Sequence, residues 1–240
     1  MKNLWKGACA VVLFGAGGLA TGPGCVDAEA PFFIVSAMEN TCDPITVDSA
    51  DLLGGVMDLR YACEYYATLR LANQLVRRGD EAKLQIETSR ISITRFDVEV
   101  LDAAENPIQR ADGSAARFTY PGYGFVDAAR AGQPGEGLAR SQLIDGATAQ
   151  ALGDALFDGN TENDVTTVIA RVVAHGRTLG GDDVQTRPWD FPIDIKYGYL
   201  CECGPDPESS SECLIVQDQP FSCALTGGDC PKLGCIAAGK

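Results

Sequence analysis

The cysteines are the feature that most constrains how this chain can fold. Six of its ten cysteines lie between positions 201 and 235, in a stretch otherwise rich in proline, serine and glycine. An even set of cysteines in an exported chain is typical of disulfides, which stabilise segments too polar to build a core of their own. We therefore expect residues 200–240 to form a disulfide-rich tail.

The first 24 residues have the features of an export signal. Lys2 and Lys6 form a short basic region, and the apolar run that follows, Gly7 to Ala20, is too short to span a bilayer as a helix. The next residues, TGPGC, resemble a degenerate bacterial lipobox, in which a small residue precedes a cysteine that is acylated and exposed by cleavage. We therefore expect Cys25 to be a lipidated N-terminus. Plain secretion and an uncleaved anchor are the alternatives.

Loss of Cys9 with the signal and lipidation of Cys25 would leave an even set of cysteines. The predicted disulfide residues, whose pairing within the tail stays open, are Cys42, Cys63, Cys201, Cys203, Cys213, Cys223, Cys230 and Cys235. A Cys42–Cys63 bond would close a loop of about twenty residues and contribute about 3 kcal/mol in the chain-entropy account. A thiolate zinc site is the alternative, but the tail lacks histidine and paired Cys-x-x-Cys sets.

Alternation of apolar and polar residues dominates positions 59–199 and is typical of half-buried strands. Strands are predicted over 59–72, 86–101, 116–120, 165–174 and 189–197. In the second of these, the alternation of Ile91 and Ile93 resumes one residue out of step at Phe96, which indicates a β-bulge. The fourth strand is expected at the centre of a sheet, and Pro192 favours an edge or bulge for the last.

This series of strands, broken by one short helix over 148–157, predicts a mainly β fold. The specific expectation is an antiparallel immunoglobulin-like β-sandwich with one short helix and a disulfide-rich C-terminal tail. A jelly roll is the nearest alternative. The predicted organisation is a signal peptide over 1–24, a tether and lead-in segment over 25–58, the sandwich over 59–199 and the tail over 200–240.

Within this organisation lie three short segments, Leu69–Leu75 (LRLANQL), Phe191–Ile195 (FPIDI) and Tyr199–Cys201 (YLC). With these segments, the organisation resembles that of predicted bacterial envelope lipoproteins of unknown function. The resemblance implies surface anchoring and a sandwich fold, and no activity. We therefore expect an exported protein of the bacterial cell envelope, anchored at the outer membrane, with periplasmic or secreted forms as alternatives.

Charge and motif content argue against nucleic-acid binding and catalysis. The formal net charge of −14 repels phosphate backbones, and no nucleic-acid-binding signature occurs. The single histidine, His175, follows an apolar strand, no G-x-S-x-G occurs, and no spacing nominates a pair of carboxylates. We expect no catalytic residue, no metal and no cofactor.

Three further motifs each have two interpretations. Residues Asp158–Asp164 (DGNTEND) cluster oxygen ligands as a calcium loop does, but the glycine is misplaced for an EF-hand, so an ordinary polar loop is favoured. Arg78-Gly79-Asp80 spells an adhesive tripeptide but is expected to be a turn. Residues Tyr120–Phe125 (YPGYGF) could present aromatic rings to a sugar or fold them onto the end of the sandwich.

These observations predict a non-catalytic envelope lipoprotein that acts as a surface-displayed structural, scaffolding or ligand-binding module. Its expected partners are the membrane, through the lipid anchor, and an envelope protein or glycan. The alternative is a secreted carbohydrate-binding or carbohydrate-active protein that uses carboxylates on a β-sandwich. A binding module should expose apolar or aromatic residues at one end of the sandwich, whereas an enzyme should show a pocket with converging carboxylates or His175.

Overall fold

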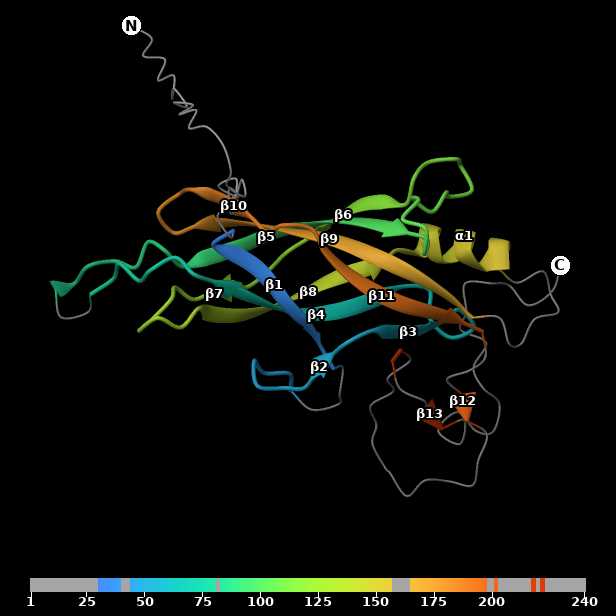
Figure 1. Cartoon of the computed structure of the whole chain (residues 1–240), viewed down its shortest axis with the longest axis horizontal. Coiled ribbons are helices and arrows are strands. Elements are labelled where there is room, and N and C mark those ends of the chain that lie inside the picture. Colours follow the sequence, from blue (N-terminus) through green and yellow to red (C-terminus); the bar gives the residue numbers. More distant parts are fainter. Residues whose placement is uncertain are drawn as a thin grey trace, which may run out of the picture.

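The computed structural model describes residues 30–39, 44–80, 83–156, 165–197, 201–202, 217–218 and 221–222. In this part of the chain two β-sheets enclose the hydrophobic core between them (Figure 1). The protein is therefore mainly β, and the two facing sheets are consistent with a β-sandwich.

The smaller sheet has four antiparallel strands in the order β2 (Asp51–Leu52), β1 (Phe32–Met38), β4 (Tyr65–Asn73) and β8 (Gly135–Ile144). Alternate residues of β4 are buried, as the alternation predicts. The strand predicted over 59–72 begins only at Tyr65, because the carbonyl of Asp58 accepts hydrogen bonds from the amides of Tyr61 and Ala62 and closes a turn.

The larger sheet has the strand order β3 (Gly55–Asp58), β11 (Trp189–Lys196), β9 (Thr166–Thr178), β5 (Ile91–Leu101) and β6 (Arg117–Pro121). Two short strands flank it: β10 (Asp183–Gln185) pairs with β9, and β7 (Phe125–Val126) pairs with β5. The predicted central position of β9 is confirmed by this order. The predicted bulge in β5 is also confirmed, since the register with β9 shifts between Ile93 and Arg95.

Two expectations about these strands differ from the structure. Strand β11 is not at an edge, because β3 pairs with it in parallel. Pro192 is accommodated because that pairing starts one residue later, at Ile193 opposite Gly55, so no ladder bond to β3 is lost. The described part of 25–58 is also more than a lead-in segment, since it supplies β1, β2 and β3 to the two sheets.

The predicted helix is present as α1 (Gly146–Leu156), and the Asp145 side chain caps it by accepting a hydrogen bond from the Thr148 amide at 3.0 Å. Two short strands, β12 (Cys201–Glu202) and β13 (Phe221–Ser222), pair in parallel. The two ends of the sandwich thus differ: α1 lies at one end, and a long projection between β4 and β5 lies at the other (Figure 1).

Candidate functional site

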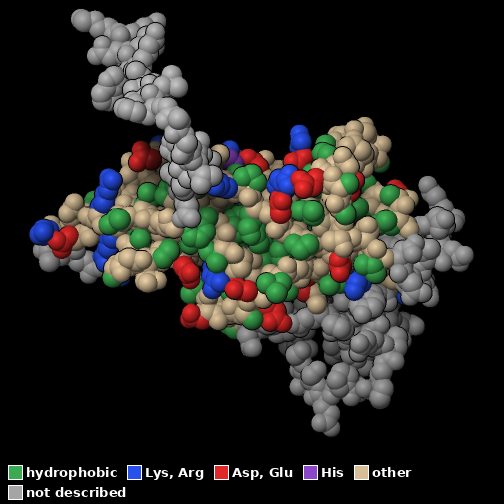
Figure 2. Space-filling view, viewed as in Figure 1, with side chains coloured by type: hydrophobic (Ala, Val, Ile, Leu, Met, Phe, Trp, Pro, Cys, Tyr) green, Lys and Arg blue, Asp and Glu red, His purple; other side chains and the backbone are tan. Residues whose placement is uncertain are grey.

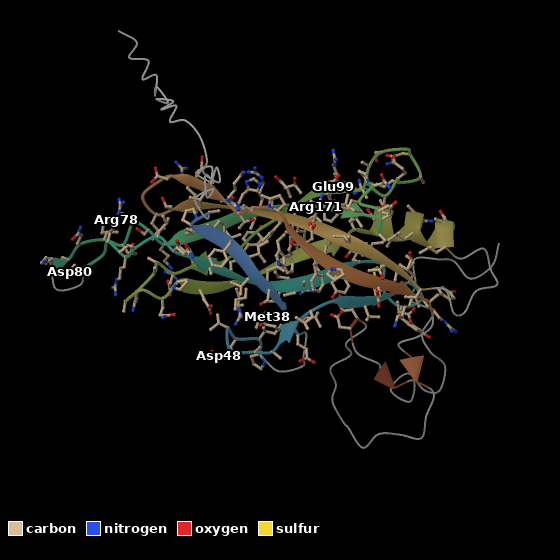
Figure 3. The ribbon with its side chains drawn as sticks, viewed as in Figure 1. Met38, Asp48, Arg78, Asp80, Glu99 and Arg171 are labelled. Carbon is tan, nitrogen blue, oxygen red and sulfur yellow. The ribbon has the colours of Figure 1, made fainter. Side chains whose placement is uncertain are left out.

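A segment between β4 and β5 projects from one end of the sandwich (Figure 1). We call residues 74–80 and 83–90 the finger; Arg78 and Asp80 lie on its outer part (Figure 3). Asp80 and Gln85 exchange two backbone hydrogen bonds of 3.0 and 2.9 Å, so the two arms of the finger pair with each other. The Arg78-Gly79-Asp80 tripeptide predicted as a turn therefore lies in one arm of a paired projection.

The finger is held to the rest of the sandwich at its base. The Arg77 amide donates to the Ala129 carbonyl at 3.1 Å, and the Ala129 amide donates to the Leu75 carbonyl at 2.9 Å. On the other arm, the amides of Leu179 and Gly180, in the turn between β9 and β10, donate to the carbonyls of Arg90 and Thr88. Three separate segments of the chain therefore meet at this end.

Glu87 joins the two arms of the finger through its side chain. Its carboxylate accepts hydrogen bonds from the backbone amides of Arg78, Gly79 and Ser89, at 3.1, 3.0 and 2.6 Å respectively. Partial burial opposes ionisation, but these amides and the nearby Arg77 guanidinium hold the pKa of Glu87 below its usual value. The charged carboxylate thus ties both arms of the finger together at neutral pH.

Large apolar side chains are exposed at this end. Leu84 is 91% exposed, Ile86 78% and Val76 73%, all on the finger, while the adjacent Leu179 and Phe125 are about half exposed. We call these five residues the apolar end; nine large apolar side chains are exposed among the described residues, so it holds more than half of them. Most monomeric proteins do not gather exposed apolar residues in this way. Basic and acidic side chains are interspersed among them (Figure 2).

The loop Tyr120–Phe125 combines the two interpretations given for it: one ring packs on the core and others are exposed. Tyr120 is partly buried against the core and meets Tyr66 edge to face, with ring centroids 6.0 Å apart. Tyr123 and Phe125 instead point into solvent, and the Arg90 guanidinium lies 4.6 Å above the Phe125 ring. Gly124, between them, has a φ of +137°, which favours glycine. This loop therefore adds the exposed ring of Tyr123 to the Phe125 ring of the apolar end.

His175 lies on the outer face of the larger sheet, in β9, where its ring is enclosed by charged neighbours. Its Nε2 is 2.7 Å from Asp97 Oδ2, and its Nδ1 is 3.3 Å from Arg95 Nη2. A guanidinium can only donate, so Nδ1 acts as the acceptor toward Arg95. Burial opposes ionisation of Asp97, but Thr119, His175 and Arg95 together lower its pKa. Both ring nitrogens thus lie against charged side chains, although the Nε2 contact with Asp97 lacks hydrogen-bond geometry.

The same outer face carries a row of charges across four strands. Arg117 of β6 pairs with Glu99 of β5 through its Nε at 2.7 Å, and Arg171 of β9 holds Asp190 of β11 through two contacts of 2.8 Å. Glu99 and Arg171 are cross-strand neighbours (Figure 3). Alternating charges of this kind are expected on the solvated face of an antiparallel sheet.

Two residues of the predicted tail contact the sandwich far from the apolar end. The Asp218 amide donates to the Val56 carbonyl at 2.9 Å, and Asp218 Oδ1 accepts from the Val56 amide at 2.8 Å and from the Tyr65 hydroxyl at 2.6 Å. Gln217 accepts from the Tyr66 amide at 3.3 Å. Burial raises the pKa of Asp218, although the hydrogen bonds from Tyr65 and Val56 act in the opposite direction.

A glycine makes room for this contact. A Cβ atom at Gly55 would lie 2.2 Å from the Tyr65 hydroxyl oxygen, so only glycine permits the hydroxyl to reach Asp218. The contact covers the side of β3 that faces away from β11, where Met57 and Gln217 form an isolated antiparallel bridge. Sequence patterns did not reveal it, because an isolated Gln-Asp pair in a polar tail carries no signal of its distant partners.

The structure describes few of the cysteines for which a disulfide or lipid role is predicted. Cys63 takes part in a disulfide, and Cys42, its predicted partner, lies outside the described residues. The same holds for Cys25, for Asp158–Asp164 and for the side chains of the tail cysteines, Cys201, Cys203, Cys213, Cys223, Cys230 and Cys235. Their roles therefore stay predictions.

Two properties of the described residues bear on metals and membranes. They contain no group of three or more His, Cys, Asp or Glu side chains placed to hold a metal ion. Among the same residues, no helix has the length and apolar character needed to cross a bilayer.

The fold and surface define a mainly β protein of two facing sheets, with a projecting end that exposes apolar side chains. Comparison of the sequence with protein-family models finds no match, and comparison with curated proteins finds no significant match either. The function is therefore argued from the residues of this chain alone.

Proposed function

We propose that this protein is a non-catalytic, lipid-anchored module of the bacterial cell envelope that binds another envelope component through the apolar end. The observation that carries the proposal is the clustering of Leu84, Ile86 and Val76 on one projecting finger. Exposed apolar clusters of this kind mark contact surfaces in folded proteins, because leaving them in water costs free energy that contact recovers.

We also propose that the sandwich is immunoglobulin-like. In such domains the first strand pairs with the second, and the third, sixth and seventh strands form the opposite sheet. Strand β1 pairs with β4, and β5, β9 and β11 lie side by side, which supports the same order. On this reading the finger joins the second and third core strands, and the β9–β10 turn joins the last two. These are two of the loops that bind antigen in antibody variable domains.

The arrangement around His175 supports the non-catalytic part of the proposal. A general base needs a nitrogen that can reach a substrate proton, and both nitrogens of His175 face Asp97 and Arg95. The carboxylates of the same face are bound by arginines and threonine, as Asp190 is by Arg171 and Asp97 by Thr119. Rows of carboxylates that are neutralised by neighbouring side chains on an open face are typical of a solvated surface rather than of an active site.

The anchor and the disulfides are tested by the intact mass of the natively expressed protein, before and after reduction. We expect a chain that begins at Cys25 and carries acyl chains, with no thiol that can be alkylated until the protein is reduced. A mass without acyl chains would contradict the anchor, and free thiols before reduction would contradict the disulfides.

The binding role is tested with a non-acylated Cys25→Ser chain, so that the lipid anchor does not contribute. We expect this chain to co-sediment with native envelope fragments, and the double substitution Leu84→Asp and Ile86→Asp to reduce that binding several-fold. Leu53→Asp is the matched control, because Leu53 is 90% exposed but lies between β2 and β3, away from the finger. Equal binding by all three chains would contradict the proposal.

Carbohydrate binding is the second candidate, favoured by the exposure of Tyr123 and Phe125. Aromatic rings exposed side by side can stack on the apolar faces of sugars. We expect Tyr123→Ala to abolish any glycan binding detected on a glycan array, while Leu84→Asp leaves it unchanged. The reverse pattern would assign the binding to the finger.

A further inference from the structure

We propose that the component bound by the apolar end is the lipid bilayer itself, so that the finger forms a second membrane contact beside the lipidated Cys25. This inference rests on the proposed function and names the partner of the same surface. It follows from where the tether joins the sandwich, how long the tether is, and how charge is distributed.

The tether, here residues 25–31, joins the sandwich at the base of the finger. Strand β1 begins at Phe32, which pairs with Asn73 at the end of β4. One residue further out, the Gln74 amide donates to the Pro31 carbonyl at 2.7 Å, and Gln74 is the first residue of the finger. The chain that leads back to Cys25 therefore leaves from the end of the sandwich that carries the apolar side chains, and α1 lies at the other end (Figure 1).

The tether is too short to carry that end far from the bilayer. Six steps of chain separate Cys25 from Pro31, and a fully extended chain covers about 20 Å over that length. The arm of the finger from Leu75 to Asp80 spans about 16 Å if it is extended. Because the reach of the finger is close to the full length of the tether, the tip can meet the surface in which the acyl chains of Cys25 are inserted.

The charge of the finger is compatible with a bilayer although the protein as a whole is acidic. The chain has a formal net charge of −14, which an anionic leaflet repels. Positions 74–90 contain four basic and three acidic residues, for a formal charge of +1. Within the described part, Lys83 pairs with Asp80 at 3.2 Å and Arg77 with Glu87 at 3.7 Å. The finger can thus approach lipid headgroups at little electrostatic cost. Leu84 and Ile86 are its most exposed apolar side chains.

These residues support a shallow insertion of the finger into the bilayer. Apolar side chains flanked by charged ones lie in the boundary between headgroups and acyl chains rather than crossing it. Tyr123 and Phe125 lie beside the same end, and aromatic rings favour that boundary. A further contact would also limit rotation of the sandwich about its anchor.

The experiment places a tryptophan on the finger of the natively acylated protein. Purified Leu84→Trp and Leu53→Trp chains, each checked for acylation by intact mass and for folding by circular dichroism, are reconstituted into phosphatidylcholine and phosphatidylglycerol vesicles with brominated acyl chains. Bromine quenches an indole only at close range. We expect quenching of the indole introduced by Leu84→Trp to be about twofold greater than that introduced by Leu53→Trp. Ile86→Trp is a second finger variant, in case Leu84→Trp does not fold.

The outcomes separate this inference from the proposed function. Equal quenching of the Leu84 and Leu53 variants in acylated, folded protein would overturn the membrane contact. If the finger substitutions nonetheless weaken binding to native envelope fragments, the proposed binding role stands and the partner is an envelope protein or glycan. A chain that carries no acyl group would overturn both the anchor and this inference.

Discussion

At the residue scale, the contact between Tyr65 and Asp218 shows how a buried polar group is accommodated. Tyr65 is fully buried, and its hydroxyl donates to a carboxylate 153 positions away in the sequence. Burial, together with that carboxylate, raises the pKa of Tyr65, so the hydroxyl stays protonated and can only serve as a donor to Asp218. The Tyr65 hydroxyl therefore donates to Asp218 at physiological pH.

Tyr65→Phe removes this donor without changing the packing of the ring. Because the acceptor is a partly buried carboxylate, we expect the free energy of unfolding to fall by about 1.5–3 kcal/mol. Tyr66→Phe is the control: its hydroxyl bonds the exposed Glu64 at 2.7 Å, and its loss should cost less than about 0.5 kcal/mol. Urea denaturation of both variants measures the difference, and equal losses would show that the Asp218 bond contributes nothing.

The raised pKa of Asp218 predicts how its contact with β3 depends on pH. A carboxyl whose pKa is raised in the folded state stabilises that state fully below its unfolded pKa of about 3.9 and loses this contribution as the pH rises through the folded pKa. The protection factor of the Val56 amide, which donates to Asp218, should therefore increase as the pH is lowered from neutrality. Asp218→Asn should remove the dependence; a dependence that survives the substitution would point to another group.

At the element scale, strands with large alternating side chains could be predicted, and strands with small ones could not. Strand β5 buries valine, isoleucine and phenylalanine on one face, so its period of two is plain in the sequence. Strand β9 has apolar residues on both faces, which predicts burial on two sides, but only the face of Val168 and Val172 is buried. Strand β8 buries Gly137, Ala139 and Ser141, which give almost no hydrophobic signal. The apolar end could not be predicted for a related reason. Leu84 and Ile86 alternate with polar residues, and this pattern is the same for a half-buried strand and for a projecting arm.

Gly137 is a position in β8 where only glycine fits. A Cβ atom there would lie 2.1 Å from the carbonyl oxygen of Phe125, where β7 crosses over β8. We expect Gly137→Ala to destabilise the protein by about 3 kcal/mol or more, because backbone must move to relieve the clash. Gly146→Ala, at the start of α1 with its nearest contact at 3.8 Å, should instead be neutral or stabilise by up to about 1 kcal/mol. Thermal denaturation of the two variants compares them directly.

At the scale of the whole molecule, the tether and the finger define one end and α1 the other, which predicts an orientation at the membrane. Lys83 lies on the finger, and Lys196 ends β11, whose last residues pair with β3. In acylated protein bound to vesicles, acetylation of Lys83 should slow relative to protein in detergent, and that of Lys196 should not. Peptide mass spectrometry measures both rates in one sample. Equal rates for Lys83 in the two conditions would contradict the orientation.

The position of Gln217 and Asp218 also bears on how the protein behaves when it is damaged. They occupy the free edge of β3, and an uncovered edge strand offers unpaired amides and carbonyls to any extended chain nearby. A protease that cut between the sandwich and this dipeptide would leave the core intact and open that edge for strand addition by a second molecule. Resistance to aggregation would then depend on two polar residues that cover the edge of β3 through hydrogen bonds.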